Sequence, residues 1–78
     1  MFFKKKARKV IGIDGMHCDR CREKIEQALG DLIDVSKVRV DLNRGIAYVY
    51  YDHSVDDVLL SETIEKLGYV VTGIKEEN

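Results

Sequence analysis

Residues 36–51 read SKVRVDLNRGIAYVYY, and this stretch predicts a β-hairpin. Apolar and charged side chains alternate through residues 36–42, which is the period of two that a half-buried strand shows. The turn signal NRG follows at residues 43–45, and the return strand is expected over residues 46–51. A thin layer of helix on sheet suits a mixture of small and large side chains. We therefore expect one set of alternate residues to face the core: Ala47, Val49 and Tyr51.

The segments on either side of this hairpin predict two more strands and two helices. Short apolar runs predict a first strand at residues 9–13 and a last strand at residues 69–74. An apolar stripe at helical spacing predicts a helix over residues 19–29. A second helix is expected over residues 55–67, with Ser54 as its N-cap. This second helix is expected to bury three side chains: Leu60, Ile64 and Leu67.

The order of these elements is strand, helix, strand, strand, helix, strand. Two βαβ halves of this kind form a ferredoxin-like βαββαβ sandwich, an α+β fold in which two helices cover one face of a four-stranded antiparallel sheet. The 78 residues are expected to form one domain, residues 1–78, with a basic lead-in at 1–8 and a polar tail at 75–78. The core of so small a domain is thin, which excludes an enzyme with a deep cleft.

Charge and hydropathy exclude several classes of partner. The chain has 13 Lys and Arg and 14 Asp and Glu, a net charge of -1, and this balance argues against a nucleic-acid binder that neutralises phosphates. No run of about 18 apolar residues predicts a membrane-spanning helix. Residues 1–9, MFFKKKARK, are not followed by the apolar segment of an export signal. We expect a cytoplasmic protein that does not insert into a membrane.

Cys18 and Cys21 are the only cysteines in the chain. Because two residues separate them, they cannot link distant segments, and the spacing indicates a metal or redox role in a reducing compartment. The second cysteine is expected in the first helical turn, where the helix N-terminus favours the thiolate. Two thiolates are a soft donor pair that selects soft ions such as Cu(I). A structural zinc site and an iron–sulfur cluster both normally need four ligands.

Other interpretations of this cysteine pair remain open at the level of the residues. Zn(II) or Cd(II) would require added carboxylates, and Asp14 and Asp19 are close in sequence. Hg(II) also accepts two thiolates. A dithiol redox centre is an alternative from another class, although a chain without proline has no cis-proline to place beside the cysteines. A third alternative is an interaction module that associates through Tyr48 and Tyr50 without metal.

The stretch GMHCDRC at residues 15–21 resembles the GMxCxxC signature of the heavy-metal-associated domain family. That family includes small cytosolic copper chaperones, N-terminal domains of copper-transporting P-type ATPases and periplasmic mercury-binding proteins. A second element, LGY at residues 67–69, is similar to the sequence that precedes the last strand in bacterial members. The resemblance extends from about residue 9 to residue 74. It implies the same βαββαβ fold and a metal carrier that is not an enzyme.

The resemblance also implies a role for individual residues. Cys18 and Cys21 match the two metal-binding cysteines of the family. Met16 matches the motif methionine, which packs beneath the loop and is not a ligand. Tyr69 matches the bacterial tyrosine that shields the site. His17 stands where Thr or Ser is commoner, and we expect it to be exposed to solvent, with a third ligand or a proton-linked modulator as the alternatives.

We therefore expect a bacterial Cu(I) chaperone that passes its ion on by thiolate ligand exchange, with Zn(II), Cd(II) and Hg(II) as alternative ions. The implied acceptors are the metal-binding domain of a copper-transporting P-type ATPase and a copper-responsive repressor. A homodimer linked by shared metal is a further expectation. Basic residues at the start of the first helix would then form a docking patch for an acidic partner. These residues are Arg20, Arg22 and Lys24.

Overall fold

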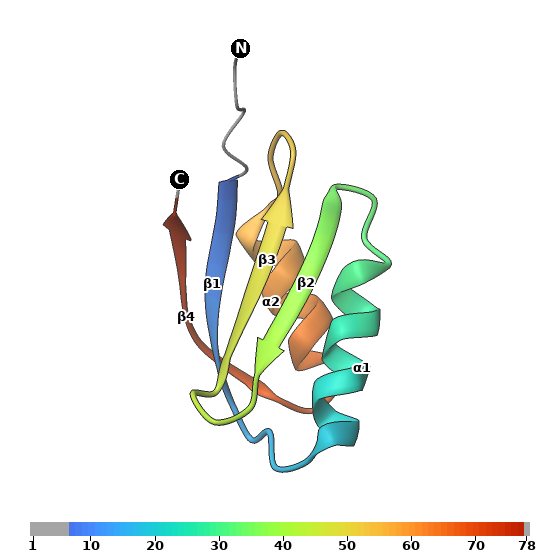
Figure 1. Cartoon of the computed structure of the whole chain (residues 1–78), viewed down its shortest axis with the longest axis vertical. Helices are drawn as coiled ribbons and strands as arrows, with labels where there is room; N and C mark the ends of the chain where they lie inside the picture. The colour runs from blue at the N-terminus through green and yellow to red at the C-terminus, as the bar shows by residue number, and fades with distance from the viewer. Residues whose placement is uncertain (1–6, 78) are drawn as a thin grey trace.

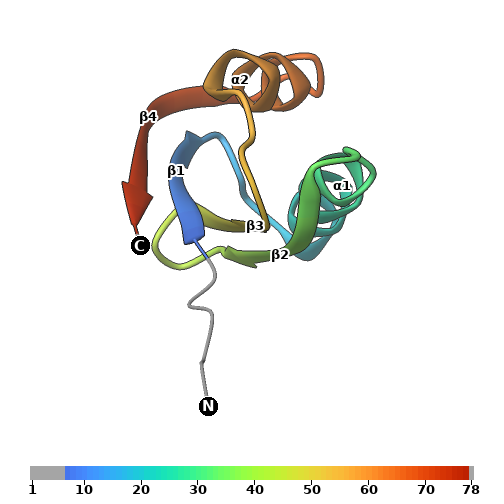
Figure 2. The ribbon, with the colours of Figure 1, turned by 90° about the horizontal axis from the view of Figure 1, so that it is seen from above.

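The computed structural model describes residues 7–77. In it, a four-stranded antiparallel sheet is covered on one face by two helices, as Figures 1 and 2 show. The strands follow the order β2-β3-β1-β4, so β1 and β3 lie in the centre. This is the ferredoxin-like α+β fold that the element order predicts. The elements are β1 (Ala7–Asp14), α1 (Asp19–Gly30), β2 (Val35–Asp41), β3 (Ile46–Tyr51), α2 (Asp57–Glu65) and β4 (Val70–Glu77).

The core lies between the sheet and the helices. On β3 the predicted set of alternate residues is buried, and Tyr48 and Tyr50 lie on the opposite face. On β1, Ile11 and Ile13 are buried on the same face of the strand. Burial of each such aliphatic side chain contributes roughly 1.5–3 kcal/mol to folding. The nine-residue α2 is shorter than the ~12–15 residues that an isolated helix needs, so its packing against the sheet must stabilise it.

Helix α2 begins two residues later than predicted. Asp56, rather than Ser54, is its N-cap, and the Asp56 carboxylate accepts a hydrogen bond of 3.1 Å from the backbone N–H of Val58. Val55 precedes the cap and is buried. Sequence pattern placed the helix start at the first capping residue, but burial of the Val55 side chain delays the helix until Asp56 provides the cap.

The second helix also ends earlier than predicted, and the prediction that Leu67 is buried is wrong. Leu60 and Ile64 are completely buried, but Leu67 lies beyond the end of α2 and is 37% exposed. Gly68 has a φ of +98°, in the left-handed region that glycine adopts without strain. The chain therefore leaves the helical path here, and Leu67 does not continue the buried stripe.

β1 begins earlier than predicted, and β4 ends later than predicted. β1 begins at Ala7, and β4 continues to Glu77, so residues 75–77 belong to a strand and are not a polar tail. The added residues pair with each other, since Arg8 lies opposite Glu77 and its guanidinium is 2.7 Å from the Glu77 carboxylate. Ladder hydrogen bonds need no apolar side chain, which is why hydropathy did not detect them. Residues 1–6 of the expected basic lead-in, and Asn78, lie outside the described residues.

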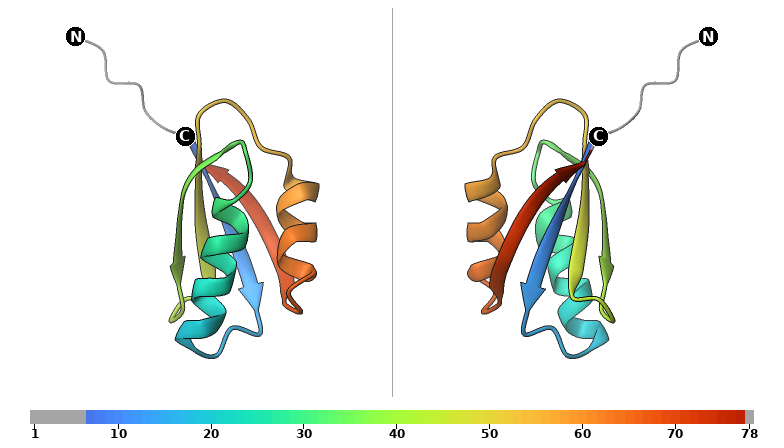
Figure 3. Two further views of the ribbon diagram at one scale, coloured as in Figure 1. Left: turned by 90° about the vertical axis from the view of Figure 1, so that its right-hand side faces the viewer. Right: turned by 90° about the vertical axis from the view of Figure 1, so that its left-hand side faces the viewer.

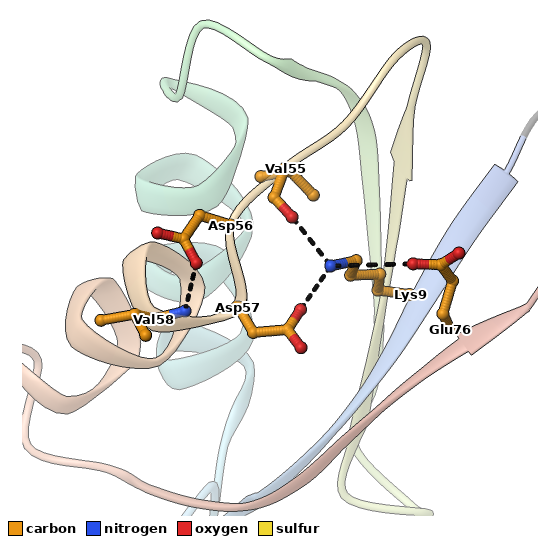
Figure 4. A network of polar contacts seen from close by, with 6 residues as sticks. All are labelled: Lys9, Val55, Asp56, Asp57, Val58 and Glu76. Atoms are coloured by element: carbon orange, nitrogen blue, oxygen red, sulfur yellow. Dashed lines mark hydrogen bonds and ion pairs between the residues drawn. The ribbon is translucent and has the colours of Figure 1, made fainter.

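Lys9 is the one charged side chain that is buried among residues 7–77, with 7% exposed. Figure 4 shows its ammonium group between three acceptors. It donates to the Val55 carbonyl oxygen at 2.8 Å and to the Asp57 carboxylate, and the Glu76 carboxylate lies 3.9 Å away. Because a buried charge without partners is costly, these contacts hold β1 against the start of α2 and against β4. The sequence analysis did not predict this network.

Replacing Lys9 with Ala is expected to lower the free energy of unfolding by about 2 kcal/mol or more, because the variant loses packing and leaves the Val55 carbonyl without its donor. Asp57 is 56% exposed, so water should compensate most of its loss. Chemical denaturation followed by circular dichroism measures the change. Lys75→Ala, at an exposed lysine of β4, is the control and should change stability by less than about 0.5 kcal/mol. Equal stability of the two variants would contradict a structural role for Lys9.

Candidate metal centre

The loop between β1 and α1 carries both cysteines at one end of the molecule. Figure 3 shows this loop beside the α2–β4 connection, at the end opposite the C-terminal end of β4. Gly15 has a φ of +101°, which allows the chain to turn after β1. Cys18 is the N-cap of α1 in an extended conformation, and its side chain makes no capping hydrogen bond. Its carbonyl oxygen accepts from the backbone N–H of Cys21 at 3.1 Å, so the second cysteine lies in the first helical turn, as predicted.

The sulfur atoms of the two cysteines converge. The distance between Sγ of Cys18 and Sγ of Cys21 is 3.6 Å. Both are free thiols, that of Cys18 exposed and that of Cys21 half-buried. Metal–sulfur bonds are about 2.3 Å long, so two sulfurs at this separation can both contact one ion. The pair is thus arranged as a two-coordinate donor set that is open to solvent on one side.

The two thiols differ in their surroundings. The pKa of Cys21 is lowered from 9.0 to about 6, chiefly by a hydrogen bond from the backbone of His17 and then by one from the Tyr69 hydroxyl. Partial burial of the Cys21 thiol opposes this shift. The same contact raises the pKa of Tyr69, because the Cys21 thiolate holds its hydroxyl proton. Cys21 is therefore mainly the thiolate at neutral pH, which is the form that binds metals.

Tyr69 reaches the loop from the connection that precedes β4. Its ring also approaches the loop backbone, since a Cβ built on Gly15 would lie 3.5 Å from Cδ1 of Tyr69. Met16 is half-buried and packs against the core. The side chain of His17 is exposed, and its contact with Cys21 is made by the backbone. Sequence reasoning considered only the imidazole of His17, and no residue pattern signals a role for the backbone.

The side chains considered as additional ligands do not gather around the thiols. Within the part of the chain that the structure describes, no group of three or more His, Cys, Asp or Glu residues is placed to hold an ion. Asp14 and Asp19 are exposed, and the Asp19 carboxylate lies 3.7 Å from the Arg22 guanidinium. The second histidine of the chain, His53, is exposed in the connection between β3 and α2, away from the cysteine loop. Among the described residues, the two thiols are thus the side chains that the structure brings together at this end.

The basic patch predicted at the start of α1 is only partly available. Arg22 lies 3.3 Å from the carboxylate of Glu26, one turn further along the helix. Glu26 in turn accepts a hydrogen bond of 3.0 Å from the backbone N–H of Val40. Arg22 thus helps to join α1 to β2, and the exposed cations of the patch are Arg20 and Lys24.

No helix between residues 7 and 77 has the length and apolar character to cross a membrane.

Alkylation of the reduced, metal-free protein should show Cys21 reacting with a half-maximal rate near pH 6, because the thiolate is the nucleophile. Tyr69→Phe removes one donor to this thiolate and should move the midpoint to higher pH. Mass spectrometry of the modified peptides separates the two cysteines. Tyr50→Phe, on the open face of the sheet, is the control. A midpoint that is the same in Tyr69→Phe and in the unchanged protein would contradict the hydrogen bond to Cys21.

The sequence and the fold of this chain are similar to those of known metal-binding proteins. The family model described as the heavy-metal-associated domain matches residues 10–70. A copper chaperone CopZ from Staphylococcus haemolyticus is 42% identical over 64 residues, which cover 81% of this chain and 94% of the relative. A solved CopZ metallochaperone superposes with a TM-score of 0.80 at 32% identity, covering 83% of this chain and 98% of that structure.

A second solved structure adds a different kind of relative. It is the N-terminal domain of a potential copper-translocating P-type ATPase from Bacillus subtilis in the Cu(I)-loaded state. It superposes with a TM-score of 0.79 at 26% identity, and the match covers 95% of this chain and 94% of that domain. The chain is thus similar both to small metallochaperones and to a metal-binding domain of a transporter.

Proposed function

This chain belongs to the heavy-metal-associated domain family, and from that membership and its paired thiols we propose that it is a copper chaperone with Cu(I) as its cargo. The observation that carries the proposal is the 3.6 Å separation of the two Sγ atoms in an exposed loop. We further propose that Cys18 and Cys21 are the metal ligands and that residues 1–78 act as one carrier domain. The high coverage of the CopZ relative supports that last point.

The choice of Cu(I) rests on the donor set. Two thiolates are soft ligands, and they suit a soft ion that is content with few ligands. Structural Zn(II) sites are tetrahedral and take four ligands, and the described residues do not supply a third donor from His, Cys, Asp or Glu. The same reasoning makes Cd(II) a poorer fit. Hg(II) also accepts two thiolates and remains the alternative ion from the same class.

The proposed transfer needs no catalytic group. Cys18 is the exposed thiol, so an incoming thiolate of an acceptor reaches the ion from its side. One metal–sulfur bond forms, and the bond to Cys18 then breaks. A second incoming thiolate replaces Cys21 in the same way. Each step exchanges one sulfur ligand for another, so the ion never loses its thiolate coordination.

The acceptors we propose are the metal-binding domain of a copper-transporting P-type ATPase and a copper-responsive repressor. The structural likeness to a Cu(I)-loaded ATPase domain supports the first of these. A domain of the same shape would bring its own loop to the end of the molecule where Cys18 and Cys21 lie. Such an exchange would take place in the cytoplasm, and two loaded copies would meet through the same loops as a metal-linked homodimer.

Replacing both Cys18 and Cys21 with Ser is expected to abolish tight Cu(I) binding. Either single replacement should lower the affinity for Cu(I) by more than roughly 100-fold. That is the loss of affinity caused by removing a residue that only supports a ligand. Competition with a chromogenic Cu(I) chelator measures the affinity. His17→Ala is the matched control and should have a small effect at neutral pH, since the contact of His17 with Cys21 is made by its backbone. Retained affinity in the double variant would contradict the ligand assignment.

A parallel titration with Zn(II) and its own indicator tests the choice of ion. The proposal requires that the reduced protein hold Cu(I) far more tightly than Zn(II). Tighter binding of Zn(II) would contradict it and make Asp14 and Asp19 ligand candidates. If neither ion binds tightly, a dithiol redox centre becomes the better interpretation, and the reduction potential of the cysteine pair is the next measurement.

Tyr69→Ala is expected to speed release of Cu(I) to a competing chelator by roughly 10-fold, because the ring that approaches the loop and the hydroxyl that donates to Cys21 are both lost. Stopped-flow measurement of transfer to the chelator gives the rate. Tyr69→Phe keeps the ring and should fall between Tyr69→Ala and the unchanged protein. An unchanged release rate in Tyr69→Ala would remove Tyr69 from the site.

A further inference from the structure

The face of the sheet that the helices leave uncovered carries cations and tyrosines in two rows. In Figure 2 both helices lie on the other side of the strands. Cross-strand pairing puts Lys37, Tyr50 and Arg8 side by side in one row. The neighbouring row holds Arg39, Tyr48, Val10 and Lys75. We call the polar and aromatic members of these rows the open-face cluster: Arg8, Lys37, Arg39, Tyr48, Tyr50 and Lys75.

The centre of the open-face cluster is held in place by its own contacts. The Arg8 guanidinium lies over the Tyr48 ring, 4.7 Å from its centroid, and donates to the Tyr50 hydroxyl at 3.4 Å. Arg8 also donates to the Glu77 carboxylate at 2.8 Å. Lys37 Nζ lies 5.9 Å from the centroid of the Tyr50 ring. A surface ordered in this way loses little side-chain entropy when it binds.

The charge of this face differs from that of the whole chain. The open face carries four cationic side chains and two carboxylates, those of Asp41 and Glu77, whereas the net charge of the whole chain is -1. Both carboxylates have partners, since Glu77 is bound by Arg8 and Asp41 lies 3.9 Å from Arg44. Within residues 7–77, Arg39 and Lys75 form no salt bridge, and both are exposed. The open face is therefore electropositive, and the rest of the described surface is acidic.

From this placement we propose that the open face of the sheet is a docking surface for an acidic segment of a partner protein. Carboxylates of such a segment would meet Lys37, Arg39 and Lys75 at the margin. Tyrosine and arginine at the centre are the residue types that contribute most to binding in protein interfaces. Charge complementarity is thus combined with an apolar residue, Val10, which lies between Tyr48 and Lys75 in its row.

Two other occupants fit the face less well. Symmetric pairing with a second copy would bring the same cations against each other, which is unfavourable. A single-stranded nucleic acid would stack its bases on aromatic rings, but Arg8 and Lys37 already lie over the rings of Tyr48 and Tyr50. The alternative of association between two copies through Tyr48 and Tyr50 is therefore less well supported than an acidic partner.

The open-face cluster lies away from the cysteine loop. Arg8 is near the start of β1, whereas the loop follows the end of this strand, as Figure 1 shows. A partner bound at the open face would leave Cys18 and Cys21 accessible. Such a second contact would raise the effective concentration of the carrier near an acceptor. The docking proposal does not depend on metal. It can therefore fail while the proposed copper function holds, and the copper function can fail while docking holds.

The test uses the reduced, metal-free full-length chain and a fluorescent oligoglutamate peptide, with binding followed by anisotropy at low ionic strength. The double variant Arg39→Glu with Lys75→Glu should bind about tenfold more weakly than the unchanged protein. Tyr48→Ala should also weaken binding. The matched control is Arg44→Glu with Lys66→Glu, which makes the same change in net charge at exposed positions outside the open-face cluster. It should bind within about twofold of the unchanged protein.

Several outcomes would overturn the proposal. Equal losses in the two double variants would mean that only net charge matters. No loss in either double variant would place the anion binding elsewhere, for example at residues 1–6. No binding by the unchanged protein would mean that the chain does not dock an acidic segment. Tighter binding of a fluorescent oligothymidylate than of oligoglutamate, lost in the open-face variant, would assign the face to nucleic acid. Circular dichroism of each variant checks that it is folded.

Discussion

The pairing of β1 with strands on both of its sides is the constraint on which the rest of this structure depends. β1 is hydrogen-bonded to β3 and to β4 over nearly its whole length, and its alternate residues Ile11 and Ile13 are buried beneath the helices. The chain leaves this central strand directly into the cysteine loop. Because the strand cannot shift without breaking two ladders and reversing its buried face, the loop begins at a fixed point.

The surroundings of Cys21 combine groups that are near in sequence with one from a distant segment. α1 orients Cys21, the loop backbone supplies the donor from His17, and the connection after α2 brings in Tyr69. The result is an unequal pair, with the Cys18 thiol exposed and the Cys21 thiol half-buried and hydrogen-bonded to the Tyr69 hydroxyl. Under the function proposed above, this inequality would let the Cys21 sulfur retain the ion while the exposed Cys18 sulfur exchanges. The contacts of Lys9 hold the other end of β1, away from the cysteine loop, against the start of α2.

The misplaced predictions share a physical cause. The sequence pattern extended the second helix from residue 55 to residue 67, because both the capping signal at Ser54 and the apolar Leu67 agreed with helical spacing. Packing of Val55 into the core and the left-handed turn at Gly68 shortened it. The end of β4 was missed because residues 75–77 are polar, and only their pairing with β1 makes them a strand. Lys9 shares the buried face with Ile11, but the tertiary partners that make its burial tolerable are 46 and 48 residues away.

The amino-acid sequence by itself determined the order of elements, the buried face of the hairpin and the placement of two thiols in one loop. Those properties depend on the alternation of neighbouring residues and on two thiols three positions apart, which are local. The tertiary structure alone decided the hydrogen bond of Tyr69 to Cys21, the partners of Lys9 and the cationic open face. Each of these requires groups from different strands or helices to meet, and their positions follow from packing and strand register rather than from the spacing of residues along the chain.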